Sequence, residues 1–455
     1  MSTSTSTTSG GVWDSAHRVL TLGLILTVSM AAFENLAVAT ILPATVSEIG
    51  GLPLYGWVFS GFMLSEIIGI SVAGRAGDAR GLAPPFAVGG ALFSIALFGA
   101  GAAGSMPVLI ACRVLQGLGA GAISTLAYAA VARGYAESAR PRMLALLSTA
   151  WVVPGLIGPA LAAGVHAYLG WRWVFLGLAP FSVGSVALAA QALRGLGPSG
   201  AADTAGNQTA AAAGLAAGVA VLLFALSLEQ LPVTLAVGGA AAAVALPTFR
   251  RLTPAGTLRG RAGLPAAVAV MALLSAAFFG AEAFVPLSLT EVRQRSVAFA
   301  GIALTAATVS WTTGAWLQAR LAPRRSRRAL VAVGLVLLAV GIAGTGGVLA
   351  PSLPAEVAPV AWAVAGLGIG LAYSTTALVV LECAPPGEEG SASSAMQLAN
   401  VVGTAIGTGV GGAVLARVSA RGGSTAAAIA LTDALAFLAA CAATALSARL
   451  PGKPP

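Results

Sequence analysis

Charged residues are scarce in this 455-residue chain. Aspartate, glutamate, lysine and arginine together make up 9% of it, whereas soluble domains carry about 25%. Hydrophobic residues make up 57%, and the mean hydropathy is +0.90. One soluble core cannot absorb so much apolar surface. The composition therefore excludes an ordinary soluble domain and indicates an integral membrane protein.

Cysteine and lysine are nearly missing as well. The three cysteines, Cys112, Cys383 and Cys441, lie far apart in or beside apolar runs, a distribution that excludes a disulfide framework or a zinc site of the usual spacing. Lys453 is the only lysine, and no Gly-x-x-x-x-Gly-Lys-Ser/Thr stretch occurs, so we expect no phosphate-binding loop for ATP. We expect neither a metal nor a cofactor.

Long apolar runs dominate what is present. A transmembrane helix needs about 20 mostly apolar residues, and the runs are of helix length without the short alternating strands of a barrel. The sequence predicts an all-α membrane protein with fourteen transmembrane helices. The predicted spans cover residues 19–43, 54–76, 83–104, 107–132, 143–166, 172–193, 210–228, 231–249, 264–289, 298–319, 329–350, 358–382, 392–416 and 424–447.

The spans divide into two sets of six with a pair inserted between them. The inserted pair flanks the turn EQLP, and a short hairpin in the membrane interface is the alternative to two full crossings. The first apolar run is too long for a cleavable signal peptide, so we expect none. The predicted domains are a cytoplasmic tail (1–18), a six-helix bundle (19–193), a linker with the hairpin (194–263), a second six-helix bundle (264–448) and a cytoplasmic tail (449–455).

The net charge of +9 suggests nucleic acid only when the positions of the arginines are ignored. They gather in short loops, as the positive-inside rule describes. With a cytoplasmic N-terminus, 18 of the 24 basic residues fall inside, so we expect both termini in the cytoplasm, a multi-pass protein of the cell membrane and no nucleic-acid partner. The inner residues are Arg18, Arg75, Arg80, Arg133, Arg140, Arg142, Arg194, Arg250, Arg251, Arg259, Arg261, Arg320, Arg324, Arg325, Arg327, Arg328, Arg449 and Lys453.

The chain also contains an internal repeat. RVLQGLGAG (113–121) matches WAVAGLGIG (362–370), and VVPGLIGPALAAGV (152–165) matches VVGTAIGTGVGGAV (401–414), both at an offset of 249 residues. The two sets of six spans are therefore predicted to be related halves. Such repeats around a midplane site are typical of alternating-access transporters.

Arg113 is the one charge in the fourth span, and Gln116 follows one helical turn later. The repeat has Trp362 and Ala365 at these positions but keeps both glycines equivalent to Gly117 and Gly121. The glycines therefore serve close helix packing, whereas the arginine is dispensable for folding. An arginine at this depth costs about 3 kcal/mol on insertion scales. We interpret it as functional, facing a polar cavity or a carboxylate; a purely structural ion pair is the alternative.

Four acids inside predicted spans are candidate partners: Glu34, Glu66, Glu282 and Asp433. Burial raises the pKa of a carboxyl group in general, and a nearby arginine lowers it. An acid that alternates between two such environments takes up and releases a proton. We expect Glu34 to be the coupling acid, with Glu66 and Glu282 next; each could instead be a structural pair or reach the interface. Glu229 and Glu382 lie at span ends and are expected to be solvated.

Several short motifs, in order, resemble those of the major facilitator superfamily, and most closely its fourteen-span drug:proton antiporters. The loop GRAGDARG (74–81) is similar to Gly-x-Leu-Ala-Asp-Arg-x-Gly-Arg-Lys, although Arg80 is displaced and the final basic pair is missing. Asp78 there is expected to cap a helix start and to pair with Arg80 or Arg142 as a cytoplasmic latch; an ordinary turn is the alternative. The matching residues of this loop and of the fourth span are Gly74, Asp78, Gly81, Arg113, Gln116, Gly117 and Gly121.

Three further motifs extend the resemblance over nearly the whole chain. PGLIGPALAAG (154–164) resembles the exporter motif Gly-x-x-x-Gly-Pro-x-x-Gly-Gly of the fifth span, with Gly158 and Pro159 matching and Pro154 in place of the first glycine. WRWVF (171–175) resembles the start of the sixth span. FENLAVATILP (33–43) resembles the first-span motif, with glutamate where that motif has aspartate.

The resemblance implies a major facilitator fold and a proton-driven exporter of amphipathic or cationic small molecules. Such a protein would work as a monomer in the lipid bilayer, with protons and a small hydrophobic substrate as partners. Proton-coupled uptake of a nutrient, or movement of a lipid, is the alternative on the same fold. A membrane-embedded enzyme or receptor is disfavoured because no metal cluster, no Ser/His pair and no soluble signalling domain is visible. We therefore expect that the protein is not an enzyme.

Overall fold

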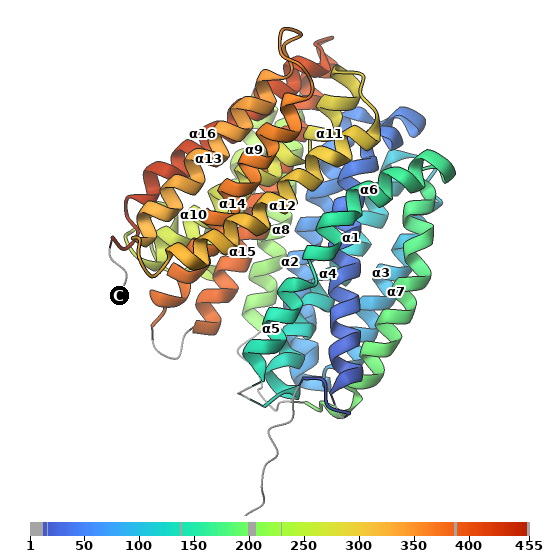
Figure 1. Ribbon diagram of the computed structural model, residues 1–455, viewed down its shortest axis with the longest axis vertical. Coiled ribbons are helices and arrows are strands. Elements are labelled where there is room, and N and C mark those ends of the chain that lie inside the picture. The colour runs from blue at the N-terminus through green and yellow to red at the C-terminus, as the bar shows by residue number, and fades with distance from the viewer. Residues whose placement is uncertain are drawn as a thin grey trace, which may run out of the picture.

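The computed structural model describes residues 12–15, 17–136, 139–198, 206–228, 230–385 and 389–452, and every regular element in them is helical. The predicted all-α class is therefore confirmed. Two sets of helices converge toward the end that carries α11 and diverge toward the end that carries α5 (Figure 1). Most of the predicted N-terminal tail, the middle of the 194–209 linker, Glu229 and Lys453 lie outside the described residues.

The first set of helices occupies residues 18–195. In order it comprises α1 (Arg18–Ile49), η1 (Leu52–Leu54), α2 (Tyr55–Arg80), α3 (Ala83–Gly101), α4 (Met106–Gly134), α5 (Arg140–Thr149), α6 (Val152–Leu169), α7 (Arg172–Ala192) and η2 (Leu193–Gly195). We call α1 to α7 the N half.

The hairpin and the second set follow. They comprise α8 (Gly206–Ser227), α9 (Leu231–Leu252), η3 (Thr257–Arg259), α10 (Leu264–Glu282), α11 (Val285–Leu287), the π-helical turn η4 (Ser288–Val292), α12 (Val297–Leu321), α13 (Arg327–Gly347), α14 (Val357–Glu382), α15 (Glu389–Ala420) and α16 (Thr425–Ser447). We call α10 to α16 the C half.

Thirteen helical segments of the described chain are long and apolar enough to cross a membrane. The remaining predicted span, 143–166, is not one helix: α5 ends at Thr149 and α6 begins at Val152. The break follows from Pro154, whose ring clashes with the carbonyl of the residue four positions earlier, Ala150. The predicted span 264–289 breaks for the same reason, because Pro286 lies four residues after Glu282, where α10 ends.

Both halves use glycine to bring two helices into backbone contact. A Cβ placed on Gly117 of α4 would lie 2.1 Å from the Phe62 carbonyl oxygen of α2. In the C half a Cβ on Gly366 of α14 would lie 2.2 Å from the Ala307 carbonyl oxygen of α12. Only glycine permits such an approach. The predicted packing role of this repeated motif thus corresponds to the same helix pair in each half.

The halves touch along two seams, α2 against α15 and α6 against α12. In the first seam Gly56 meets Gly412, and the Tyr55 hydroxyl donates a hydrogen bond to the Ala283 carbonyl at 2.9 Å. In the second seam Gly301 packs against the Pro159 carbonyl. All these residues lie toward the ends of the helices that are remote from the chain termini. The halves are therefore joined at that end, which we call the far end.

The inserted hairpin packs against the first seam. Helix α8 contacts both α2 and α15, while α9 packs on α8 and is largely exposed. Arg417 of α15 donates hydrogen bonds to the Leu228 carbonyl and to the Thr234 hydroxyl, the latter at 3.2 Å, and so fixes the turn of the hairpin. Because α8 and α9 each have the length and hydropathy of a span, the hairpin has the dimensions of two full crossings.

We expect the hairpin to cross the membrane completely. In a variant without native cysteines, a cysteine at Pro198 or Ala255 should be labelled from the side of the termini, and one at Gln230 only from the opposite side. Impermeant maleimide labelling of right-side-out and inverted vesicles measures this. Labelling of positions 230 and 255 from the same side would favour an interfacial hairpin and reduce the span count to twelve.

Candidate functional site

Arg113 lies on α4 with 1% of its surface exposed, and its guanidinium group makes several contacts. Its Nε donates a hydrogen bond to the Val58 carbonyl at 3.1 Å, and its Nη1 donates to Gln116 Oε1 at 3.0 Å and to Glu34 Oε1. The guanidinium carbon lies 4.2 Å from the centre of the Phe62 ring. A charge-assisted pair, two neutral acceptors and an aromatic face thus compensate for the loss of water.

Glu34 of α1 is buried with Arg113, at 1% exposure. Only one of its carboxyl oxygens is bonded; within the described residues Oε2 has no hydrogen-bond partner, and neither has Gln116 Nε2. Buried polar groups are nearly always paired because an unpaired one costs about 1–3 kcal/mol. The network therefore keeps one spare acceptor and one spare donor.

A second acid lies beside this pair. Glu66 of α2 is partly exposed, has no ion pair or hydrogen bond among the described residues, and interacts electrostatically with Arg113. One arginine is thus paired with one carboxyl group and lies within electrostatic range of a second. Since a single positive charge cannot neutralise both, the arrangement favours a proton on one of them. We call Glu34, Glu66, Arg113 and Gln116 the charged cluster.

The other two acids lie elsewhere. Glu282 is the last residue of α10 and is partly exposed. Asp433 lies on α16, is 8% exposed and packs beside Gly346 of α13, inside the C half. Neither has an ion pair within the part of the chain that is described. Of the four candidate acids, Glu34 thus contacts Arg113, Glu66 lies within electrostatic range of it, and the other two lie apart.

The loop motif corresponds to an ion pair inside the N half. Asp78 lies in the last turn of α2, so the expectation that it caps a helix start is wrong. Its partner is Arg133 at the end of α4, rather than Arg80 or Arg142. Arg80 is exposed, and Gly81 has a φ of 82°, the left-handed conformation that favours glycine.

The C half carries the counterpart of this ion pair with its charges reversed. Arg327 at the start of α13 donates to Glu382 at the end of α14, at 2.8 Å. Glu382 stands 249 residues after Arg133, the offset of the repeat. Glu382 is exposed, as expected for an acid at a span end, but the ion pair with Arg327 was not expected. The offset of the repeat could have revealed these pairings, because it relates the ion pair of Asp78 to the ion pair of Glu382.

The fifth-span motif lies where three helices meet. Gly158 faces Phe33 of α1, and the Pro159 carbonyl faces Gly301 of α12. Pro154 stands just after the break between α5 and α6 and lines a crevice of about 430 Å³ between α1, α6 and α7. The fifth-span motif therefore belongs to the seam between the halves rather than to the charged cluster.

Gly74, which belongs to the loop motif of α2, has only Thr125 of α4 nearby.

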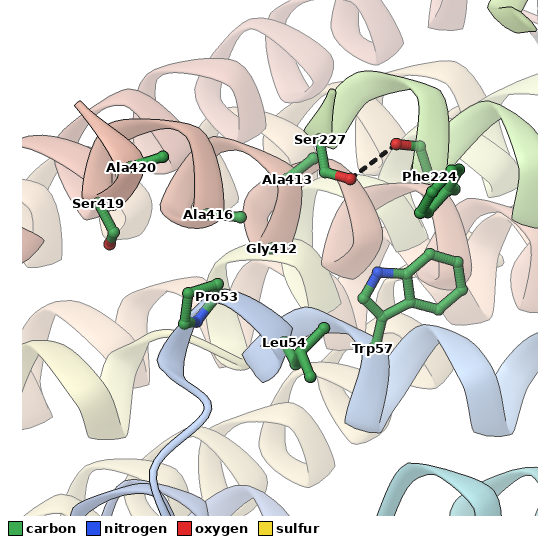
Figure 2. A pocket seen from close by; sticks show the side chains of 10 residues that line it. All are labelled: Pro53, Leu54, Trp57, Phe224, Ser227, Gly412, Ala413, Ala416, Ser419 and Ala420. Carbon is green, nitrogen blue, oxygen red and sulfur yellow. Dashed lines mark hydrogen bonds between the residues drawn. The ribbon is translucent and has the colours of Figure 1, made fainter. Parts of the chain in front are cut away.

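A second cavity, of about 400 Å³, lies at the far end between α2, α8 and α15. Figure 2 shows Leu54 and Trp57 on one side and Gly412, Ala413 and Ala416 on the other. None of the described residues that line it has an ionisable side chain. Among the described residues there is also no group of three His, Cys, Asp or Glu side chains that could hold a metal ion. This cavity therefore adds no charged side chain to those already described.

Comparison with known proteins agrees with this picture. The family model described as Major Facilitator Superfamily matches residues 24–408. A probable multidrug-efflux transporter of Mycobacterium tuberculosis (strain ATCC 25618 / H37Rv) is 29% identical over 444 residues, which covers 89% of each chain. Multidrug resistance protein 3 of Bacillus subtilis (strain 168) is 28% identical over 158 residues, 35% of this chain and 31% of that protein.

Solved structures share the fold at low sequence identity. A bacterial homologue of the human lysosomal transporter Spinster, in an inward-facing and unoccupied conformation, has a TM-score of 0.67 and 13% identity, covering 96% of this chain and 98% of that one. A D-xylose-proton symporter has a TM-score of 0.60 and 15% identity, covering 92% and 95%. At such identities the likeness concerns the fold alone.

We expect Arg113→Ala to insert and fold but to lose thermal stability. The substitution leaves Glu34 buried without its counter-charge, which costs about 3–5 kcal/mol in soluble proteins. The double variant Glu34→Gln, Arg113→Ala should recover part of the loss because it removes the unpaired charge. Thermal unfolding of the detergent-solubilised proteins measures this. A double variant no more stable than Arg113→Ala would contradict the pairing argument.

Proposed function

Because the chain belongs to the major facilitator superfamily, and is thus a multi-pass membrane transporter rather than an enzyme, we propose that it exchanges protons for an amphipathic or cationic small molecule. The exchange expels the molecule from the cell by alternating access. The names of the efflux relatives support export. The observation that carries proton coupling is the charged cluster, in which one buried arginine is paired with one carboxyl group and lies within electrostatic range of a second.

The cluster exchanges protons with one side of the membrane at a time, because transport alternately opens the space between the halves to either side. Because the halves are joined at the far end, we infer that the cluster exchanges protons with the side of the termini, which the distribution of arginines assigns to the cytoplasm. There a carboxyl group loses its proton and pairs with Arg113. When the halves rock and access moves to the other side, a proton from outside neutralises the acid and releases that pairing. Each direction of rocking is thereby tied to one protonation state.

The driving force is electrical as well as chemical. A membrane potential contributes about 2.3 kcal/mol per elementary charge per 100 mV. An exchange that carries net positive charge inward is therefore driven by the potential, without ATP or a cofactor. The protein works as a monomer in the cell membrane with both termini in the cytoplasm.

Proton coupling should depend on Glu34. Glu34→Gln mimics the protonated acid, so proton-driven accumulation of substrate should fall at least tenfold while downhill exchange continues. Arg113→Ala should stop turnover, because the acid loses the charge that competes with the proton. Uptake into everted vesicles, with and without a pH gradient, measures both. Glu291→Gln, an exposed acid outside the cluster, is the control.

Two outcomes would contradict this assignment. Full proton-driven accumulation by Glu34→Gln would move the coupling acid elsewhere, with Glu66 next. Accumulation of substrate only when the gradient is reversed would indicate a proton symporter rather than an exporter.

The Asp78–Arg133 pair should affect the rate of rocking rather than stability. Both side chains are partly exposed, and such pairs contribute only about 0–1 kcal/mol. Asp78→Asn should therefore slow transport several-fold with an unchanged melting temperature, and the exchange Asp78→Arg with Arg133→Asp should restore part of the rate. Initial rates in vesicles measure this. A wild-type rate for Asp78→Asn would make the residue an ordinary turn residue.

A further inference from the structure

The C half has aromatic rings where the N half has charges. Trp362 stands 249 residues after Arg113 on the equivalent helix. Instead of an ion pair it makes a parallel stack with Phe278 of α10, with ring centres 5.1 Å apart and an interplanar angle of 14°. Because α10 opens the C half as α1 opens the N half, the Phe278–Trp362 stack joins the same pair of helices that Glu34–Arg113 joins in the N half.

The glycine contacts give the equivalence for the neighbouring helix. Gly121 of α4 packs on the Glu66 carbonyl of α2, and Gly370 of α14 packs on the Trp311 carbonyl of α12. Gly121 and Gly370 are related by the repeat offset. Trp311 is thus the counterpart of Glu66, so a second charged position of the N half is aromatic in the C half.

These rings form one continuous cluster. Trp311 meets Phe278 edge-on with centres 5.4 Å apart and at 89°, and it lies 6.0 Å from Phe279 and 5.8 Å from Tyr373. Phe278 and Trp362 are completely buried, whereas Phe279, Trp311 and Tyr373 are partly exposed. The buried stack is therefore a rigid base beneath three accessible rings, which we call the aromatic face.

The aromatic face lies toward the N half. Ala39 of α1 belongs to the same buried cluster as Phe278 and Trp362, and Phe59 of α2 packs against it. Phe279, Trp311 and Tyr373 pack against this same cluster. The accessible rings therefore border the space between the halves rather than the lipid.

An acid without a partner stands beside these rings. Glu282 is three residues after Phe279 on α10, so the two side chains share one face of the helix about one turn apart. Glu282 is partly exposed and has no ion pair or hydrogen bond within the described residues. It also lies apart from Arg113, so no positive charge of the protein compensates it there.

We propose that the aromatic face, with Glu282, is the recognition surface for the transported molecule, and that this molecule is a planar aromatic cation. Its ring stacks against Trp311 between Phe279 and Tyr373, because the negative face of an aromatic ring attracts a delocalised cation. Its charge is balanced by Glu282. This inference rests on the proposed function for its transport context, and it assigns Glu282 to the cargo rather than to proton coupling.

Binding to the purified full-length protein in detergent tests the proposal without any gradient. The probes are ethidium and a neutral phenanthridine with the same ring system, and the readout is fluorescence anisotropy. Trp311→Ala should weaken both probes at least tenfold, Trp311→Phe should keep most of the affinity, and Glu282→Gln should weaken ethidium alone. The matched control is Trp316→Ala, which removes a 66% exposed tryptophan five residues along the same helix and should change neither affinity.

Several results would overturn the proposal. They are unchanged ethidium binding by a folded Trp311→Ala variant, equal losses in Trp316→Ala, equal effects of Glu282→Gln on both probes, or no binding of either probe by the wild type. If Trp311→Ala does not fold, Tyr373→Leu and Phe279→Leu at the edge of the cluster replace it, with the same tenfold loss expected. Because no gradient is used, failure of proton coupling in vesicles would leave this result standing, and the reverse also holds.

Discussion

A positive charge buried in a membrane must be compensated by the protein, and in this chain that constraint acts on Arg113. Its partners come from three directions: Glu34 on α1, the Val58 carbonyl on α2, and Gln116 on its own helix. The Val58 contact requires α4 to lie against the backbone of α2, which the absence of a side chain at Gly117 permits. The close packing of α2 and α4 therefore also provides the contact that compensates the charge of Arg113.

The repeat shows that this solution is not required for the fold. At the equivalent position the C half fills the space with Trp362 stacked on Phe278, and the helix pair keeps its glycine contacts. Apolar rings need no counter-charge, so packing alone fills this position in the C half. The same scaffold thus carries a charged pair at one of the two equivalent positions and an aromatic stack at the other.

Much of this fold could be predicted from the sequence because span-length apolar runs are unambiguous. The helix breaks at 150–151 and 283–284 were missed, although Pro154 and Pro286 follow them closely, because hydropathy does not register a lost hydrogen bond. The proximity of Glu34 and Arg113 is a contact between spans one and four, which the repeat suggested. That Glu282 and Asp433 stand apart could not be foreseen, since the angular position of a residue on an apolar helix is set by its neighbours.

The inserted hairpin gives the molecule a property that neither half has. Two related halves define two seams, which would be interchangeable if the pseudo-symmetry were perfect. Helix α8, secured by Arg417, packs along α2 and α15 and leaves α6 and α12 without such a cover. A lipid or a membrane-dissolved compound that diffuses around the transporter can thus reach the seam between α6 and α12 directly, whereas α8 covers the seam between α2 and α15. The protein is therefore asymmetric within the plane of the bilayer, with one seam open to the lipid and the other covered.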